Sequence, residues 1–386
     1  MKFVIAPDSF KNSLSAKEVA TAMKEGLSRI FPKAEYTLVP MADGGEGTVQ
    51  SLVDATNGHL IHRNVTGPLG TPVDAYYGIL GDGTTAVIEM AQASGFQYVP
   101  AEQRNPLVTT TYGTGELILD ALNHDVKKII LGIGGSATND GGAGMAQAIG
   151  VRLLDASSNE FPGGGGALNN LEHIDMSHVD PRIAHTEILV ASDVAVPLIG
   201  PNGASAVFGP QKGATPKMVK LLDANLKHYA AVIKHDLGKE VADIPGSGAA
   251  GGLGAGLMAF TNAKMFKGID LVVEFSHLKQ KVQGADFIFT GEGSIDEQTQ
   301  YGKTPYGVAL ATKQVVPTAP VIALGGRIGH GISSLYGKNS IDAIFSVAID
   351  NKPLDVAIKD SKQDIALSTE NVARLIKGIY QDKSVD

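Results

Sequence analysis

The sequence contains no cysteine, which excludes disulfide bonds and any mechanism with a thiolate nucleophile. It also lacks an apolar run of the ~18 residues that a membrane-spanning helix needs. The nearest stretch, residues 246–260, is mostly glycine and alanine. The apolar stretch before Pro7 and Asp8 is too short for a signal peptide. These absences predict a soluble protein of the reducing cytoplasm that has no membrane partner.

Positive charge is scarce as well. The 32 lysines and arginines are outnumbered by 40 aspartates and glutamates, for a formal net charge of −8. Such a chain has no long-range attraction for nucleic acid, so that partner is not expected. An anionic ligand must then be held by local hydrogen-bond donors, individual lysines or a divalent metal. Zinc is not expected, because no pair of the ten histidines has the His-x-x-x-His spacing and no cysteine is present.

Glycine is abundant, with 47 residues, and its most informative cluster follows the apolar run 129–133, which predicts a buried strand. Small and polar residues come directly after that run: Gly134, Gly135, Ser136, Thr138, Asn139 and Asp140. A predicted Ala/Gly/Met helix follows. A glycine-rich turn between a strand and a helix presents backbone N–H groups to a phosphate. We therefore predict that this turn binds phosphate or substrate, although Asp140 could simply cap the helix.

The same turn also satisfies a dinucleotide-binding pattern, Gly-x-Gly-x-x-Ala, which begins at Gly132 and ends at Ala137. Asp155 follows the next predicted strand, where a ribose-binding acid is expected. An NAD-linked oxidoreductase is therefore the alternative function, and a non-catalytic nucleotide-binding regulator is a third. Asp140 argues against NAD, because a carboxylate at the helix start repels a bare pyrophosphate unless a cation lies between them.

Strands and helices alternate at both ends of the chain, which predicts an α/β fold. Residues 1–66 and 287–386 are expected to form one doubly wound domain, Rossmann- or flavodoxin-like. Residues 67–286 are expected to form an inserted, mixed α/β domain, because several strands follow one another without helices near the first boundary. The active site is expected in the cleft between the two domains.

Polar clusters follow the predicted strands, where open α/β sheets bind their ligands. They contain Asp8, Ser9 and Lys11; Asp43 and Glu46; the turn 136–140; Asp193; and Glu292, Asp296 and Lys303. Carboxylates beside phosphate-type turns indicate Mg²⁺, since its sites combine few carboxylates with phosphate oxygens. The Gly-Lys-Thr at Lys303 is not predicted to be a P-loop, because Glu297 occupies the position of the first glycine. Lys212, between glycines, is interpreted as a surface residue.

Five segments then form a recognisable set: Ala6-Pro-Asp-Ser-Phe-Lys11, Pro40-Met-Ala-Asp-Gly-Gly-Glu-Gly-Thr48, Gly134-Gly-Ser-Ala-Thr-Asn-Asp-Gly-Gly-Ala-Gly144, Phe208-Gly-Pro-Gln-Lys-Gly213 and Thr290-Gly-Glu-Gly293. In order and spacing, along essentially the whole chain, they resemble the bacterial type I glycerate kinases. The resemblance implies Mg²⁺-dependent phosphoryl transfer from ATP to D-glycerate, usually giving 2-phosphoglycerate. It also implies two α/β domains, one inserted in the other.

Three positions depart from that pattern: Asn12 and Val196 replace an expected Gly and Asn, and Ser294 replaces the Arg often seen after Gly-Glu-Gly. The last departure removes a potential cation near the phosphates or the substrate carboxylate. The partner of that carboxylate is left open, with Arg63, Arg104 and Arg327 as candidates.

The resemblance and the residues together predict the following roles. Asp193 is the general base toward the glycerate hydroxyl, since it ends a strand of the inserted domain and is expected to face the cleft. Lys11 and Lys303 stabilise the transferring charge. The predicted substrate- and phosphate-binding residues are Asp8, Ser9, Gly134, Gly135, Ser136, Thr138, Asn139 and Asp140. The predicted metal ligands are Asp43, Glu46, Glu292 and Asp296. Which carboxylate acts as base, and whether the turn holds ATP or glycerate, stays open.

Overall fold

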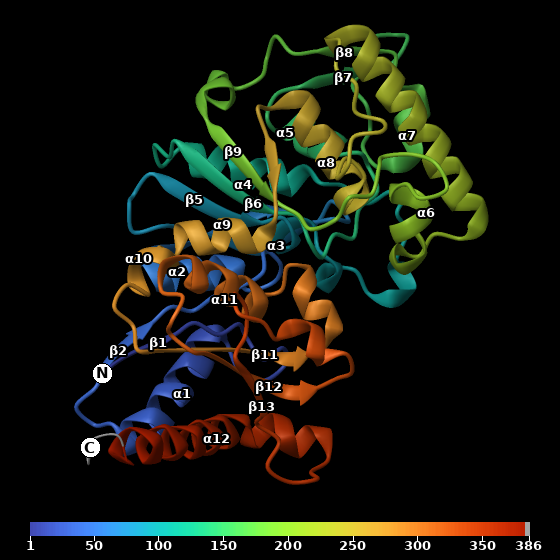
Figure 1. Cartoon of the computed structure of the whole chain (residues 1–386). Helices are drawn as coiled ribbons and strands as arrows, with labels where there is room; N and C mark the ends of the chain where they lie inside the picture. Colours follow the sequence, from blue (N-terminus) through green and yellow to red (C-terminus); the bar gives the residue numbers. More distant parts are fainter. Residues whose placement is uncertain (383–386) are drawn as a thin grey trace. The chain divides into compact units, whose positions relative to one another are not determined.

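The computed structural model describes residues 1–382, which form two compact units (Figure 1). Unit 1 contains Met1–Asp43, Gln50–Asn57 and the chain from Ile269 onward, and unit 2 contains Gly44–Val49 and Gly58–Gly268. Helices and parallel strands alternate in both units, so the predicted α/β class is confirmed. Among residues 1–382, no helix has the length and apolar character that a membrane span requires.

Unit 1 is built on a five-stranded, wholly parallel sheet with the order β2-β1-β11-β12-β13. The strands are β1 (Lys2–Ile5), β2 (Glu35–Leu38), β11 (Phe287–Ile295), β12 (Val321–Ile328) and β13 (Ala343–Ser346). Numbered within the unit, this is the order 2-1-3-4-5 of a flavodoxin-like, doubly wound sheet, as predicted. In such a sheet the winding reverses between the first and third strands, here β1 and β11, and ligands bind at that switch point.

Helices cover this sheet. On one face, α1 (Ala16–Ile30) and α12 (Leu354–Asp382) pack on a core that includes Phe3, Phe289 and Leu324. Figure 1 shows α10 and α11 on the opposite side of the sheet from α12. The remaining helices of the unit are α2 (Thr48–Thr56, which begins in unit 2), α9 (Gly268–Phe275), α10 (Leu278–Lys281) and α11 (Thr304–Val315). A capping box starts α1, because Ser15 Oγ accepts from Glu18 N and the Glu18 carboxylate accepts from Ser15 N.

Unit 2 contains a six-stranded mixed sheet with the order β10-β9-β6-β5-β4-β3. The strands are β3 (His59–Thr66), β4 (Pro72–Ile79), β5 (Thr85–Glu89), β6 (Lys128–Gly132), β9 (Glu187–Ala191) and β10 (Lys264–Phe266). The four strands from β10 to β5 are parallel, and β4 and β3 are added antiparallel. A separate antiparallel pair consists of β7 (Arg152–Leu154) and β8 (His173–Asp175). This is the mixed organisation predicted for the middle of the chain.

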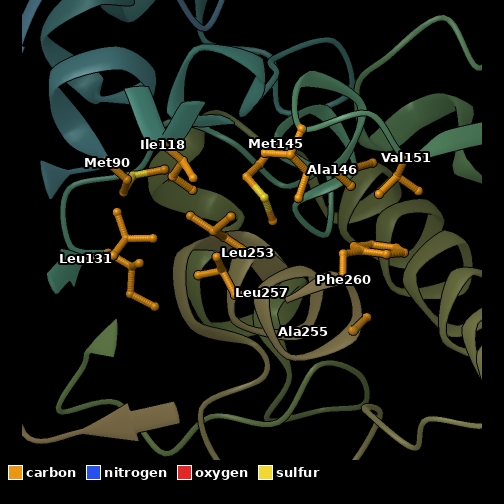
Figure 2. Close-up of a cluster of buried hydrophobic side chains, with 14 of the residues drawn as sticks. Met90, Ile118, Leu131, Met145, Ala146, Val151, Leu253, Ala255, Leu257 and Phe260 are labelled. Atoms are coloured by element: carbon orange, nitrogen blue, oxygen red, sulfur yellow. The ribbon is translucent and has the colours of Figure 1, made fainter. Parts of the chain in front are cut away.

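The core of unit 2 anchors the glycine-rich segment on both of its sides. Leu131 of β6 and Met145 of α5 lie among the buried side chains drawn in Figure 2, together with Leu253 and Leu257 of α8. The turn between β6 and α5 is therefore held by apolar packing at its two ends. The helices of the unit are α3 (Ala91–Ser94), α4 (Tyr112–Leu122), α5 (Ala143–Ala148), α6 (Ala204–Phe208), α7 (Pro216–Leu237) and α8 (Ala249–Phe260).

The observed units and the predicted domains, 1–66 with 287–386 and 67–286, differ at both junctions. Strand β3 pairs with β4 along its whole length and so belongs to the sheet of unit 2, although the predicted boundary near residue 66 leaves it in the first domain. Helices α9 and α10 precede the predicted boundary at residue 287, yet unit 1 contains the chain from Ile269 onward. Segment Gly44–Val49 also belongs to unit 2.

Candidate active site

A cavity of about 310 Å³ lies at the switch point of the unit 1 sheet. Because β1 and β11 are adjacent and parallel, the polar residues at their carboxyl ends meet there. The cavity is lined by Asp8, Ser9, Lys11, Asp43, Glu292, Gly293, Ser294 and Lys303. The structure thus brings six of the predicted site residues together in one place. Asp296 is not among the lining residues; its carboxylate caps the 3₁₀ helix Glu297–Tyr301.

Asp8 is buried in this cavity wall and firmly held. Thr304 Oγ1 donates to Asp8 Oδ2 at 2.6 Å, and Ser9 N donates to Asp8 Oδ1 at 2.6 Å. Burial, with a further contribution from the charge of Asp43, raises the pKa of Asp8 to about 6. Thr304 was not predicted, because its only signal in the sequence is its position directly after Lys303.

Glu292 is the second buried carboxylate of the cavity. Thr299 Oγ1 donates to Glu292 Oε1 at 2.7 Å, and Lys303 Nζ lies 3.6 Å from the same oxygen. Burial, with smaller contributions from Asp8 and Asp43, raises the pKa of Glu292 to about 7, although Thr299 and Lys303 oppose the shift. The pKa values of two carboxyl groups in one cavity are therefore raised toward neutral pH, as is common in catalytic sites.

The donor set of the cavity fits a cation that also takes ligands from phosphate. Asp8, Asp43 and Glu292 repel one another, and a divalent cation would relieve that repulsion. The protein alone does not supply a complete cage: among residues 1–382 no group of three or more His, Asp or Glu side chains is arranged to hold a metal ion. Mg²⁺ typically uses one or two carboxylates with phosphate oxygens and water, so the residues fit that mode of binding.

In unit 2, polar groups follow the carboxyl ends of three adjacent parallel strands, β5, β6 and β9. Glu89 ends β5, the glycine-rich turn follows β6, and Asp193 follows β9. Asp193 is exposed, and its Oδ1 accepts a hydrogen bond from Gly268 N at 3.2 Å. Gly134 and Gly135 are exposed as well, and Gly135 has φ +76°, a conformation that favours glycine.

The polar side chains of the turn point inward, away from its exposed glycines. Asp140 is fully buried and accepts four hydrogen bonds, from Thr111 N and Oγ1 at 2.8 Å each, Gly142 N at 3.0 Å and Gly144 N at 3.2 Å. Thr138 and Asn139 are also fully buried, and Asn139 Nδ2 donates to Ser205 Oγ at 3.0 Å. A ligand at the turn would meet the glycine backbone before these side chains. Asp140 stabilises the turn through its backbone hydrogen bonds, whereas Thr138 Oγ1 and Asn139 Oδ1 have no hydrogen-bond partner among residues 1–382.

Lys212, which the sequence led us to interpret as a surface lysine, contacts the centre of this turn. It is buried, and its Nζ donates to Ser136 Oγ at 2.7 Å and to Thr138 O at 2.5 Å. Burial lowers the pKa of Lys212 to about 7, although the charge of Asp140 opposes the shift. The ammonium group thus ties the turn to the segment around residue 212. The sequence did contain a sign that Lys212 is functional, because segment 208–213 is one of the five segments that carry the family resemblance.

Glu89 is another functional candidate that the sequence did not reveal. It is buried, and its Oε1 accepts from Val49 N at 2.9 Å, with further hydrogen bonds from the backbone of Gly47 and Thr48. The carboxylate therefore binds the N-terminal end of α2. Burial, with a smaller contribution from the exposed Glu46, raises the pKa of Glu89 to about 7. Glu46, a predicted metal ligand, belongs to unit 2, whereas Asp43, Glu292 and Asp296 belong to unit 1.

The structure provides no dinucleotide site of the predicted kind. Strand β7, which precedes Asp155, pairs with β8 in the separate two-stranded sheet. It does not lie beside β6. The Asp155 carboxylate accepts hydrogen bonds from Ser157 N and Asn159 N at 2.8 and 2.9 Å in an exposed turn. In a dinucleotide site, the ribose-binding acid lies at the end of a strand next to the glycine-bearing strand, in the same sheet. Asp155 follows a strand of a different sheet and so cannot take that role.

Comparison with known proteins agrees with this geometry along the whole chain. A family model described as "Glycerate kinase family" matches residues 3–377. The chain is 54% identical to a glycerate kinase of Halalkalibacterium halodurans, over 96% of this chain and 97% of that protein. It is 52% identical to a glycerate 2-kinase of Escherichia coli strain K12, over 97% of each. A crystal structure from Salmonella typhimurium LT2, assigned to glycerate kinase 2, covers 99% of both chains at 50% identity with a TM-score of 0.91.

A doubly wound unit that carries an acidic, lysine-bearing cavity, with a mixed α/β unit inserted in its chain, is thus the fold of a class of kinases. The chain belongs to the glycerate kinase family. The kinase prediction is confirmed, and the NAD-linked alternative through Gly132, Ala137 and Asp155 is not supported. The family implies ATP as the phosphoryl donor.

Proposed function

We propose that the protein transfers the γ-phosphoryl group of ATP to a hydroxyl of D-glycerate, with Mg²⁺, and forms 2-phosphoglycerate. The observation that carries the proposal is the 52% identity, along nearly the whole chain, to a relative named glycerate 2-kinase. The cavity of unit 1 supports it chemically. Phosphoryl transfer asks a protein mainly to position phosphate groups and neutralise their charge, and this cavity combines lysines with carboxylates.

Lys11 and Lys303 are the proposed stabilisers of the transferring charge. Both line the cavity, and Lys303 Nζ is held 3.6 Å from Glu292 Oε1 and 3.8 Å from Asp296 Oδ1. An ammonium group binds phosphate as a compact point charge with several donors. When bound, Mg²⁺ would neutralise phosphate charge, and Asp43 and Glu292 are the best placed of the four predicted ligands to hold it.

In unit 2, Asp193 is the proposed general base toward the glycerate hydroxyl. The residue is exposed, and the bond from Gly268 N orients its carboxylate. The exposed backbone of Gly134 and Gly135 follows the adjacent strand and offers N–H groups to an anion. Ser136, Thr138, Asn139 and Asp140 would then act indirectly, by holding that backbone in place.

One assay tests the function. The purified protein is incubated with ATP, Mg²⁺ and D-glycerate, ADP is measured, and the product is identified by phosphorus NMR. Glycerate-dependent ADP with 2-phosphoglycerate supports the proposal, and 3-phosphoglycerate would contradict the position of transfer. No ADP, with nucleotide still bound, would contradict the kinase and favour a nucleotide-binding regulator.

A further inference from the structure

Arg327 is an exposed arginine of β12 whose side chain forms no hydrogen bond or ion pair with any of residues 1–382. The other two arginines considered as carboxylate partners are engaged in unit 2. Arg63 Nε donates to Asp120 at 2.8 Å, and the Arg104 guanidinium lies 5.1 Å from the ring centre of Phe96. A guanidinium group without a protein partner is therefore available in unit 1, the unit that contains the acidic cavity.

The sheet register relates Arg327 to that cavity. Arg327 is the direct partner of Ser294 in the parallel β11–β12 pair, and Ser294 lines the cavity. Residues in register on neighbouring strands project from the same face of a sheet, with their backbones about 4.8 Å apart. Arg327 is not itself among the residues that line the cavity, but its side chain is longer than that separation, and the Ser294 side chain beside it is small. The Arg327 guanidinium can therefore reach over Ser294 to the mouth of the cavity.

The charge of the cavity creates a need for such a group. Its lining has three carboxylates, Asp8, Asp43 and Glu292, against two ammonium groups. Before Mg²⁺ binds, these lining side chains offer no net positive charge to a ligand that carries phosphate or carboxylate groups. The guanidinium fork binds planar carboxylates and phosphates through two parallel hydrogen bonds, which a lysine cannot do.

We propose that Arg327 binds an oxyanion of the substrates, a nucleotide phosphate or the glycerate carboxylate, at the mouth of the unit 1 cavity. It thereby supplies from β12 the cation that Ser294 does not supply from β11. This assignment rests on the proposed function and adds to it a substrate-binding residue that lies on a neighbouring strand.

A transposition experiment tests the assignment. Arg327→Ser removes the guanidinium, and the double variant Arg327→Ser with Ser294→Arg moves it to the cross-strand neighbour. Arg374→Ser is the matched control, because Arg374 is an exposed arginine of α12 whose partner is Glu370. KM and kcat are measured with ATP and D-glycerate varied separately. The loss of one charge-assisted contact should raise one KM about 10- to 100-fold, and the double variant should recover most of that loss.

The substrate whose KM rises identifies the oxyanion: ATP for a phosphate, D-glycerate for the carboxylate. Arg327→Lys, which keeps the charge without the fork, should show an intermediate loss. Unchanged KM values in Arg327→Ser overturn the assignment. A double variant no better than Arg327→Ser also overturns it, because the effect would then not depend on a cation over Ser294.

Direct binding separates this assignment from the proposed function. Calorimetric titration with inorganic tripolyphosphate and with D-glycerate reports on Arg327 without turnover. A wild-type protein that forms no ADP contradicts the function alone. If, in addition, Arg327→Ser binds both probes as tightly as wild type, the assignment fails on its own evidence. Thermal unfolding of each variant confirms that the comparison is between folded proteins.

Discussion

Thr304 Oγ1 donates a hydrogen bond to Asp8 Oδ2 at 2.6 Å, between residues 296 positions apart in the chain. Asp8 lies in the loop after the first strand, and Thr304 is the first residue of α11. The bond therefore joins the N-terminal strand of unit 1 to its C-terminal half at the wall of the cavity. Because Asp8 is buried, its carboxylate depends on such donors.

Thr304→Val is expected to destabilise the protein. The change removes the donor to a buried carboxylate, and an unsatisfied buried polar group costs on the order of 1–3 kcal/mol. The free energy of unfolding in urea should fall by that amount at pH 8, where Asp8 is ionised. Thr318→Val, at an exposed threonine of the same unit, is the control. Equal stability of the two variants would show that the Thr304–Asp8 bond contributes nothing.

Glu292→Gln is expected to stabilise the free protein at high pH. Burial raises the pKa of Glu292 from 4.5 to about 7, so between these values the folded protein binds more protons than the unfolded one. Its contribution to the free energy of unfolding therefore falls as pH rises from 4.5 to 7. The variant, which cannot ionise, should exceed wild type in urea unfolding at pH 8 and match it at pH 5. The opposite order would contradict the raised pKa.

The same carboxyl group should also couple binding to proton release. Mg²⁺ binds ionised carboxylates, so binding of Mg²⁺ with ATP near pH 6.5 is expected to release protons from wild type. Calorimetry in two buffers of different ionisation enthalpy measures that release. Glu292→Gln should reduce it. An unchanged release would mean that Glu292 gives up no proton when the ligand binds.

Lys212→Met is expected to loosen the glycine-rich turn. Two buried acceptors, Ser136 Oγ and Thr138 O, lose their donor. Each unsatisfied acceptor should lower the free energy of unfolding by about 1–3 kcal/mol. Since burial lowers the pKa of Lys212 from 10.5 to about 7, the folded protein binds fewer protons than the unfolded one between these values. Wild-type stability from this group therefore rises with pH above 7. Urea unfolding at pH 7 and 9 should show that rise in wild type and in Lys220→Met, but not in Lys212→Met.

Asp193→Asn tests the proposed base. If Asp193 accepts the proton of the glycerate hydroxyl, the substitution should lower kcat by about 10²- to 10⁴-fold, with the nucleotide Kd little changed. Asp243→Asn, at an exposed aspartate of the same unit, should leave kcat unaltered. Near-normal turnover in Asp193→Asn would remove the residue from the base role.

The sequence predicted much of the fold because its signals were local. The alternation of strands and helices and the apolar run 129–133 depend only on nearby residues. The domain boundary that was predicted near residue 66, by contrast, depends on residues distant in the sequence. Whether β3 joins one sheet or the other depends on its pairing with β4, and a short apolar run carries no information about its partner strand.

Sequence signals located some of the residues that line the cavity and missed other buried candidates for a related reason. Asp8, Lys11 and Glu292 were found because they directly follow or end predicted strands, and the sheet order then brings them together. Lys212 and Glu89 were missed because their roles depend on burial and on partners at least 40 positions away. A run of small polar residues also does not reveal which of its side chains are buried. Asp140, for example, is fully buried.

Strand β1 is a central strand of its sheet, with β2 on one side and β11 on the other. Its second neighbour begins at Phe287, about three quarters of the chain later. During synthesis, the first strand therefore has an unpaired edge while all of unit 2 leaves the ribosome. Pairing of such distant segments is slow, and an open edge invites association with other chains. The N-terminal strand of this enzyme therefore cannot complete its sheet pairing until the C-terminal part of the chain has been synthesised.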